Sequence, residues 1–100
     1  MEVKVNTRDG ELTAEVKETI AEKVSKLPRF FDRTTAIQVI ADLKHDEPKV
    51  EIILSAEGAK DFFASDSGTN VVSALDTTIA KMEQQLRKHK EKTTEHRDRH

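Results

Sequence analysis

The chain has 100 residues, enough for one domain with a modest core, and it contains no cysteine, which excludes disulfides and thiolate metal sites. Its N-terminus lacks the apolar stretch of a signal peptide, and no apolar run approaches the roughly 18 residues of a membrane span. The net charge of −2 hides an asymmetry, because residues 1–80 carry 10 Lys/Arg and 15 Asp/Glu whereas residues 81–100 carry 7 and 4. We therefore expect a soluble cytoplasmic protein whose basic C-terminal end favours an anionic partner.

The first elements that the sequence predicts are a short strand and a helix. Residues 2–6 alternate between polar and apolar as in a half-buried strand, and Asp-Gly at 9–10 marks a turn. Thr13 is a suitable N-cap because its hydroxyl can accept a hydrogen bond from a free amide of the first turn. A helix of about fourteen residues follows, which we expect Pro28 to end. Its apolar stripe consists of Val16, Ile20, Val24 and Leu27.

Three short strands are predicted next, at residues 34–43, 49–56 and 60–66. Each alternates apolar and polar side chains, and turns at 44–48 and 57–59 separate them. Strands joined by such short turns form an antiparallel meander, whose apolar face needs a cover. The adjacent residues Phe62 and Phe63 must point to opposite faces of the sheet, so the outward ring is a candidate for stacking on a nucleic-acid base.

A long C-terminal helix can provide that cover. Thr69 or Asn70 can cap it, and an apolar seam follows at spacings of three and four. The helical pattern continues to about Lys92, a length of roughly 35 Å, and the polar residues 93–100 are expected to form a disordered tail. Such a seam can also pair with a partner helix, but the bare sheet face in the same chain favours packing on the sheet. The seam consists of Val72, Leu75, Ile79, Met82 and Leu86.

The predicted element order is β-α-β-β-β-α, an α+β sandwich with two helices on one face of a four-stranded sheet. The last five elements match the order of a double-stranded-RNA-binding domain, although a likeness of fold is a weak argument for function. We expect a single domain over residues 1–92.

Basic residues on the two helices are the candidates for binding. They are long enough to reach phosphate oxygens, and clustered cations bind nucleic acid partly by releasing its counterions. Lys81 and Lys88 lie two helical turns apart on one face, and Arg87 is next to Lys88. If both helices lie on one sheet face, their basic edges form one patch. The alternative is that these residues only keep the protein soluble, since Glu83 and Glu91 interrupt the series of basic residues on the last helix. The candidate residues are Lys23, Lys26, Arg29, Lys81, Arg87, Lys88, Lys90 and Lys92.

Catalytic and metal-binding functions have little support in the sequence. The histidines His89, His96 and His100 lie in the polar C-terminal end, and no nucleophile-elbow, zinc-protease or phosphate-loop motif occurs. Asp76 is the one acid among the apolar positions of the last helix, and we expect it to be partly buried and paired with a cation or with backbone amides. The sequence thus predicts no enzyme, cofactor, metal or small-molecule substrate.

Two segments of the chain resemble one known family. The first, from Glu22 to Asp32, is similar to the E-K-L-x-K-L-x-R-F-F-D segment of the ribosome hibernation-promoting factor and ribosome-associated inhibitor family, also described as sigma-54 modulation proteins. The second runs from Ala64 through Ala74-Leu-Asp76 to Lys92 and is similar to that family's A-S…A-I-D…K-L-E-x-Q-L-x-K-x-K pattern. The likeness covers about residues 1–92 in order, and the two segments together are specific.

The resemblance implies binding in the small-subunit channel that holds messenger and transfer RNA, near the decoding site. Occupying that channel would block translation and keep idle ribosomes intact. The matched positions that would contact ribosomal RNA are the eight candidate cations, and Asp76 matches the acid of the A-I-D triplet. The partner would be the small ribosomal subunit with its ribosomal RNA, bound by a monomer.

The sequence departs from the family pattern in two places. Val72 stands where the family often has tyrosine, so a contact that requires that ring is absent. Longer members carry a C-terminal dimerisation domain after a linker, whereas this sequence ends at His100, so the resemblance is to the short class.

Two other functions are consistent with the pattern. The C-terminal helix could extend past the sheet and pair with a helix of another protein, although His89 continues the apolar seam poorly. A general binder of double-stranded RNA would also fit the element order. A size measurement without RNA tests the first alternative, and competition between ribosomes and a plain RNA duplex tests the second.

Overall fold

The computed structural model describes the backbone of residues 1–44 and 46–98 and the side chains of these residues up to position 89. The predicted order and the α+β class are confirmed, with one short 3-10 helix in addition. The elements are β1 (Glu2–Arg8), α1 (Ala14–Val24), the 3-10 helix η1 (Leu27–Arg29), β2 (Thr34–Asp42), β3 (Lys49–Ala56), β4 (Phe62–Ser67) and α2 (Val71–Asp98).

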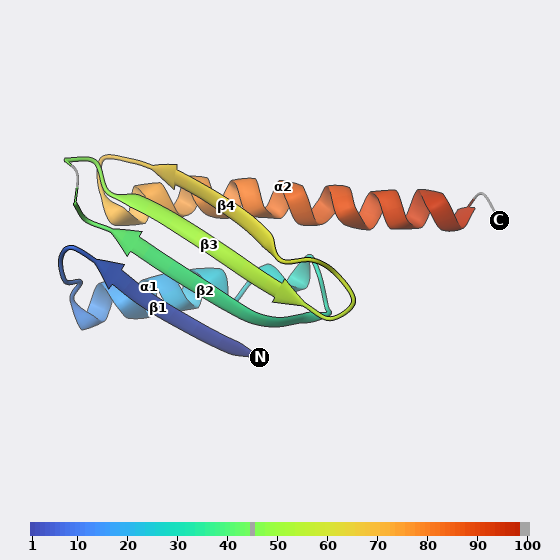
Figure 1. The fold of residues 1–100 in the computed structure, drawn as a ribbon, viewed down its shortest axis with the longest axis horizontal. Helices are drawn as coiled ribbons and strands as arrows, with labels where there is room; N and C mark the ends of the chain where they lie inside the picture. Colours follow the sequence, from blue (N-terminus) through green and yellow to red (C-terminus); the bar gives the residue numbers. More distant parts are fainter. Residues whose placement is uncertain (45, 99–100) are drawn as a thin grey trace.

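The four strands form one sheet in the order β1-β2-β3-β4 (Figure 1). Strands β2, β3 and β4 are antiparallel neighbours, which confirms the predicted meander. β1 pairs with β2 in parallel because α1 carries the chain back between them. The first and last strands of the chain are therefore the two edges of the sheet.

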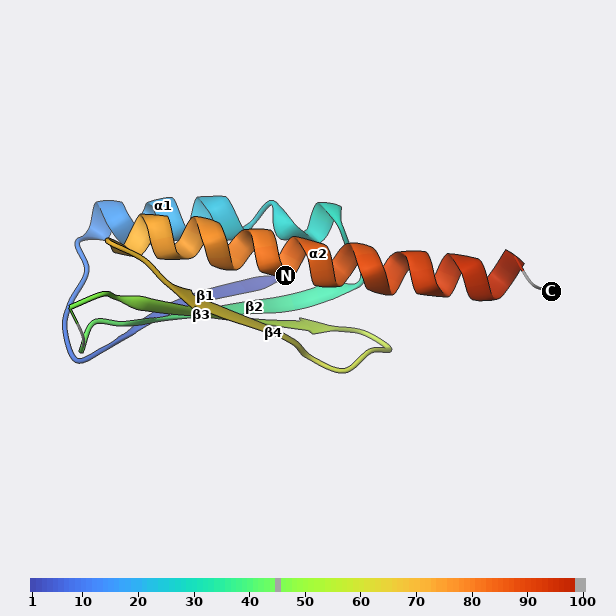
Figure 2. The same cartoon turned by 90° about the horizontal axis from the view of Figure 1, so that it is seen from above.

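Both helices lie on the same face of the sheet, as predicted (Figure 2). α2 packs on β3 and β4, whereas α1 packs against β1 and against α2. Alternate residues of each strand point toward the helices; on β2 these are Ile37, Val39 and Ala41, all buried. The opposite face of the sheet is covered by no helix of the described chain and is open to solvent (Figure 2).

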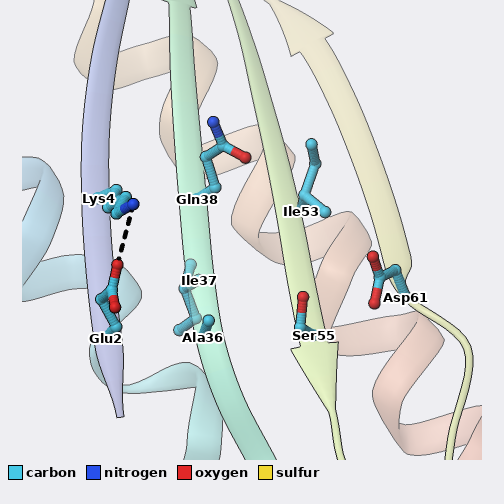
Figure 3. Close-up of a pocket in the computed structure, with 8 residues that line it drawn as sticks. All are labelled: Glu2, Lys4, Ala36, Ile37, Gln38, Ile53, Ser55 and Asp61. Carbon is cyan, nitrogen blue, oxygen red and sulfur yellow. Dashed lines mark ion pairs between the residues drawn. The ribbon is translucent and has the colours of Figure 1, made fainter.

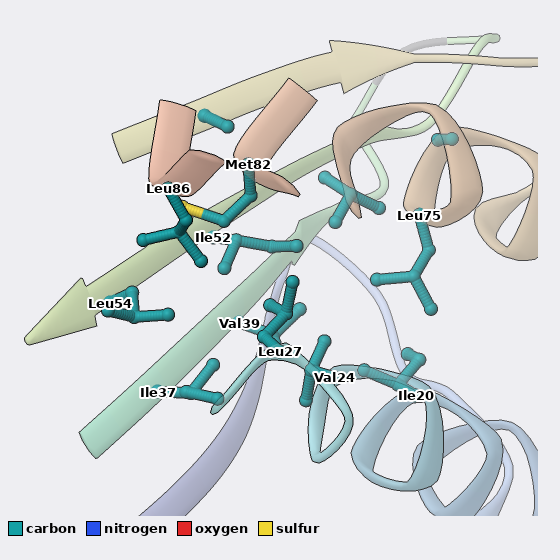
Figure 4. Packing of buried hydrophobic residues seen from close by; sticks show 13 residues of the cluster. Ile20, Val24, Leu27, Ile37, Val39, Ile52, Leu54, Leu75, Met82 and Leu86 are labelled. Carbon is teal, nitrogen blue, oxygen red and sulfur yellow. The ribbon is translucent and has the colours of Figure 1, made fainter. Parts of the chain in front are cut away.

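The hydrophobic core lies between this sheet face and the two helices (Figure 4). Of the predicted α2 seam, Leu75, Met82 and Leu86 are fully buried. Ile79 is partly buried and packs against the core, whereas Val72 is partly exposed and does not, and Val71 packs there in its place. The helix is rotated so that its buried stripe also includes two residues that apolar spacing did not predict, Ala74 and Thr78.

The first helix begins as predicted and ends earlier than predicted. The hydroxyl of Thr13 accepts a hydrogen bond from the amide of Val16 at 3.2 Å, which confirms the N-cap. α1 has 11 residues and ends at Val24, four positions before Pro28. Proline has no amide proton for the carbonyl four residues earlier, and its ring clashes with that carbonyl, so the helix stops there. Pro28 then lies inside η1, where its fixed φ angle is compatible with the first turn.

The last helix begins at the predicted cap and continues further than predicted. Oδ1 of Asn70 accepts a hydrogen bond from the amide of Ser73 at 2.8 Å. The helix ends at Asp98, so the predicted end near Lys92 is wrong. Neither glycine nor proline follows Gly68, and the segment after the seam consists largely of good helix formers, so no residue stops the helix.

Candidate nucleic-acid interface

Three of the predicted cations lie where the chain leaves α1. Lys23 is in the last turn of α1, Lys26 precedes η1 and Arg29 ends it. Lys26 and Arg29 are exposed, and neither forms an ion pair with a carboxylate of the described side chains. The break in the helix before Pro28 thus presents two charges beside the helix layer that no described acid neutralises.

Lys23 is held by an acid on the other helix. Its Nζ lies 2.9 Å from Oδ1 of Asp76, which is 53 positions later in the chain and lies in the second turn of α2. The predicted pairing of Asp76 with a cation is confirmed, but its predicted partial burial is wrong, because 55% of the side chain is exposed. An exposed pair of this kind stabilises a fold by at most about 1 kcal/mol. Its main effect is to neutralise Lys23 locally.

Lys81 joins α2 to the edge of the sheet. Its Nζ lies 3.0 Å from Oδ2 of Asp66 and donates a 3.2 Å hydrogen bond to the carbonyl of Ser65. The Lys81 ammonium, together with the Ser67 amide that donates to Asp66, holds the pKa of this carboxyl below its usual value. Asp66 is therefore ionised at neutral pH, and its carboxylate partly neutralises the charge of the Lys81 ammonium group.

Arg87 and Lys88 are exposed, but they have different surroundings. The guanidinium carbon of Arg87 lies 5.0 Å from the centre of the Phe30 ring, within the range of a cation–π interaction. Lys88 forms no ion pair with any described carboxylate. Arg87 therefore has a preferred position next to η1, whereas Lys88 is free to reach into solvent.

The basic residues of α2 lie on two flanks of the helix. Lys81 contacts β4, whereas Arg87 contacts Phe30 at the end of η1. At 3.6 residues per turn these two positions are about 120° apart around the helix axis, and Lys88 returns to the side of Lys81. Arg87 therefore lies with the cations near η1, and Lys81 and Lys88 form a second group on the other flank of α2. That both groups belong to one patch stays a prediction. The remaining candidates, Lys90 and Lys92, lie outside the described side chains.

An aromatic cluster fixes the basic part of α2, and the sequence did not predict it. The rings of Phe31 and Phe62 have centres 5.7 Å apart, and that of His89 lies 5.4 Å from both. The expectation that His89 continues the apolar seam poorly is wrong, because it packs between the two phenylalanines. Its spacing of three from Leu86 is the signal in the sequence that could have predicted this position. The cluster anchors α2 one turn beyond the aliphatic core, next to Arg87 and Lys88.

The open face of the sheet carries a different surface. A shallow hollow of about 330 Å³ lies there and includes Glu2, Lys4, Gln38 and Asp61 (Figure 3). Lys4 is paired with Glu2 at 3.1 Å, so its charge is partly neutralised and its attraction for a phosphate is weaker. Phe63 is 51% exposed on this same face, as predicted for the outward ring. Stacking of a base on this ring stays a prediction, and it would occur on the side opposite the helix cations.

The described part of the chain contains no group of three or more His, Cys, Asp or Glu side chains that could hold a metal ion. Within the same residues, no helix is sufficiently long and apolar to cross a membrane.

Known families and proteins resemble this chain over nearly its whole length. A family model described as Sigma 54 modulation protein / S30EA ribosomal protein matches residues 3–94. The ribosome hibernation promoting factor of Azotobacter vinelandii is 34% identical over 95 residues, which cover 95% of this chain and 88% of that protein. The protein of the same name from Escherichia coli (strain K12) is 28% identical over 96 residues, covering 96% and 100%.

Solved structures share the fold. The crystal structure of the Thermus thermophilus Protein Y N-terminal domain superposes with a TM-score of 0.78 at 20% identity, covering 89% of this chain and 99% of that domain. A ribosomal subunit interface protein from Coxiella burnetii gives a TM-score of 0.77 at 22% identity, covering 90% and 98%. The likeness to a double-stranded-RNA-binding domain stays a prediction based on element order.

Proposed function

Because the chain belongs to the Sigma 54 modulation protein / S30EA ribosomal protein family, we propose that it binds the small ribosomal subunit near the decoding site and blocks messenger and transfer RNA there. The match over residues 3–94 confirms the resemblance carried by the two sequence segments. Relatives of similar length are named ribosome hibernation promoting factors, so the chain has a ribosome-associated role in hibernation.

The observation that carries the proposal is a set of exposed cations on the helix-bearing face that no described carboxylate neutralises. These are Lys26, Arg29 and Lys88. Such side chains reach phosphate oxygens and release counterions when they do so. Arg87, held beside η1 by Phe30, adds a planar group suited to bidentate contact with phosphate. In this proposal Lys90 and Lys92, whose side chains lie outside the described residues, also contact ribosomal RNA.

Inhibition by this protein requires no chemical step. The family is one of hibernation factors and not of enzymes. The chain is an elongated body of 51 × 23 × 18 Å, which can fill a channel that otherwise holds nucleic acid. We propose that a monomer acts in this way in the cytoplasm, with the small subunit and its ribosomal RNA as partners.

The proposal is tested by removing the unpaired cations. The variant K26A/R29A/K88A should co-sediment less with purified small subunits than wild type does, and its binding should depend less on salt. Each lost phosphate contact lowers the log–log salt slope by about 0.7–0.9. The matched control is K4A/R8A/K49A, which removes the same charge from the open sheet face. Equal sedimentation of the two triple variants would mean that the helix-bearing face is not the binding surface.

Pairing of α2 with a helix of another protein has less support. Figure 1 shows that α2 extends past the sheet. However, residues 90–98 of this extension contain no apolar side chain, so it lacks the seam that helix pairing requires. A particle that remains monomeric at high concentration without RNA is the expected result.

A further inference from the structure

Two of the candidate RNA-binding lysines, Lys23 and Lys81, are paired with acids. Asp76 is 2.9 Å from Nζ of Lys23, and Asp66 is 3.0 Å from Nζ of Lys81. Both pairs join separate elements, α1 to α2 in one case and α2 to β4 in the other. Neither pair is buried, so approaching RNA meets the carboxylate together with the ammonium group.

The two acids repel a phosphate that approaches these lysines. A phosphate in contact with Lys23 would lie within about 5 Å of the Asp76 carboxylate, and unit charges at that distance in water repel enough to lower affinity about fourfold. The same reasoning applies to Asp66 beside Lys81. A phosphate at Lys26, Arg29 or Lys88 does not meet this penalty from any described ion pair.

We propose that Asp76 and Asp66 are specificity residues that weaken binding to RNA in general and so favour folded RNA over flexible single strands. Folded RNA holds its phosphates at fixed positions, so it can place them on the unpaired cations without placing one beside Asp76 or Asp66. A flexible strand has no fixed phosphate positions and also lies against the paired lysines, where the acids repel it, so the repulsion weakens the flexible strand more than the folded RNA. This inference rests on the proposed function, because it concerns the same surface.

Asp76 and Asp66 could instead orient Lys23 and Lys81 toward RNA. In that case their removal would weaken RNA binding. As specificity residues, they strengthen RNA binding when they are removed. The sign of the change therefore decides between the two roles.

The experiment measures binding of a fluorescein-labelled oligouridylate by anisotropy at several salt concentrations. The variants D76N and D66N keep the size of the side chain, and the amide oxygen introduced by D66N can still accept a hydrogen bond from the Ser67 amide. Each should bind the oligouridylate about fourfold more tightly than wild type and steepen the log–log salt slope by about 0.7. Their affinity for purified small subunits should change less, so the preference for the subunit falls.

Two controls make the test specific. E51Q removes an acid that is paired with Lys49 at 3.7 Å on the open sheet face, and it should leave oligouridylate binding unchanged. In K23Q/D76N the gain should disappear, because the lysine that was released is no longer present. Thermal unfolding verifies that each variant is folded.

Equal or weaker oligouridylate binding by D76N and D66N would overturn the inference, as would undetectable binding by all variants at low salt. If K26A/R29A/K88A loses small-subunit binding while D76N and D66N behave like wild type, the proposed function holds and this inference alone fails. If the triple variant binds small subunits normally, the proposed function itself fails.

Discussion

The side-chain amide of Gln85 on α2 donates a 2.7 Å hydrogen bond to the backbone carbonyl of Phe63 on β4. β4 is an edge strand, so this carbonyl would otherwise be open to a strand of another molecule. Lys81 binds the next carbonyl on the same edge, that of Ser65, at 3.2 Å. Side chains of α2 therefore cover the free edge of β4.

The variant Q85A should expose this edge. We expect the free energy of unfolding in urea to fall by about 0.5–1.5 kcal/mol, the usual effect of losing one hydrogen bond. We also expect concentration-dependent association in sedimentation velocity, because an unprotected edge can pair with another chain. Q84A is the matched control, since Gln84 is the preceding residue and is exposed. If both variants remain monomeric and equally stable, Gln85 does not protect the edge.

The corrected seam of α2 can be tested by two truncations. L75A removes a fully buried side chain and should lower the free energy of unfolding by about 2–5 kcal/mol. V72A truncates a partly exposed residue outside the core cluster and should lower it by less than about 1 kcal/mol. Chemical denaturation of both variants provides the comparison. Similar losses of unfolding free energy in the two variants would support the seam predicted from the sequence, in which Val72 and Leu75 are both core residues.

Phe30 and Arg87 should be energetically coupled. A double-mutant cycle with F30L, R87Q and the double variant should give a coupling free energy of about 0.5–1 kcal/mol, typical of an exposed cation–π pair. Urea unfolding measures each corner of the cycle. The cycle built with K88Q in place of R87Q is the control and should give a value near zero. A coupling as small as the control value would show that the ring does not hold the guanidinium.

Asp66 should make stability depend on pH in the acid range. The Lys81 ammonium lowers the pKa of this carboxyl from its usual value of 3.8, so the folded state binds the proton less readily than the unfolded state does. Its contribution to stability is therefore present above about pH 4 and is lost as the pH falls through the lowered pKa. D66N should be less stable than wild type at pH 7, and the difference should shrink toward pH 3.

Thermal unfolding of wild type and D66N across this pH range provides the measurement. K81M removes the same ion pair from the other side. The free energy of unfolding of K81M should therefore depend less on pH in this range than that of wild type. A difference that stays constant from pH 7 to pH 3 would mean that the carboxylate charge contributes nothing to the fold.

Apolar periodicity predicted the strands, the two helices and most of the core. The alternation in β3 placed Val50, Ile52 and Leu54 on the buried face, where they lie. Local chemistry likewise predicted the caps at Thr13 and Asn70, because a cap requires a side chain and an amide three residues apart. The family was evident from two segments for a related reason: its characteristic residues follow one another along the chain, so they can be recognised without the structure.

The sequence by itself therefore determined the elements, their order, the apolar faces and the family. Tertiary structure alone decided which basic residues are free, because Lys23 meets Asp76 and Lys81 meets Asp66 only once the helices are seated on the sheet. It also decided that Arg87 and Lys88 face different flanks, and that His89 packs between two phenylalanines. Charges and rings are paired by distance in space, which depends on the rotation of α2 and on its crossing with α1, and spacing along one helix does not contain that information.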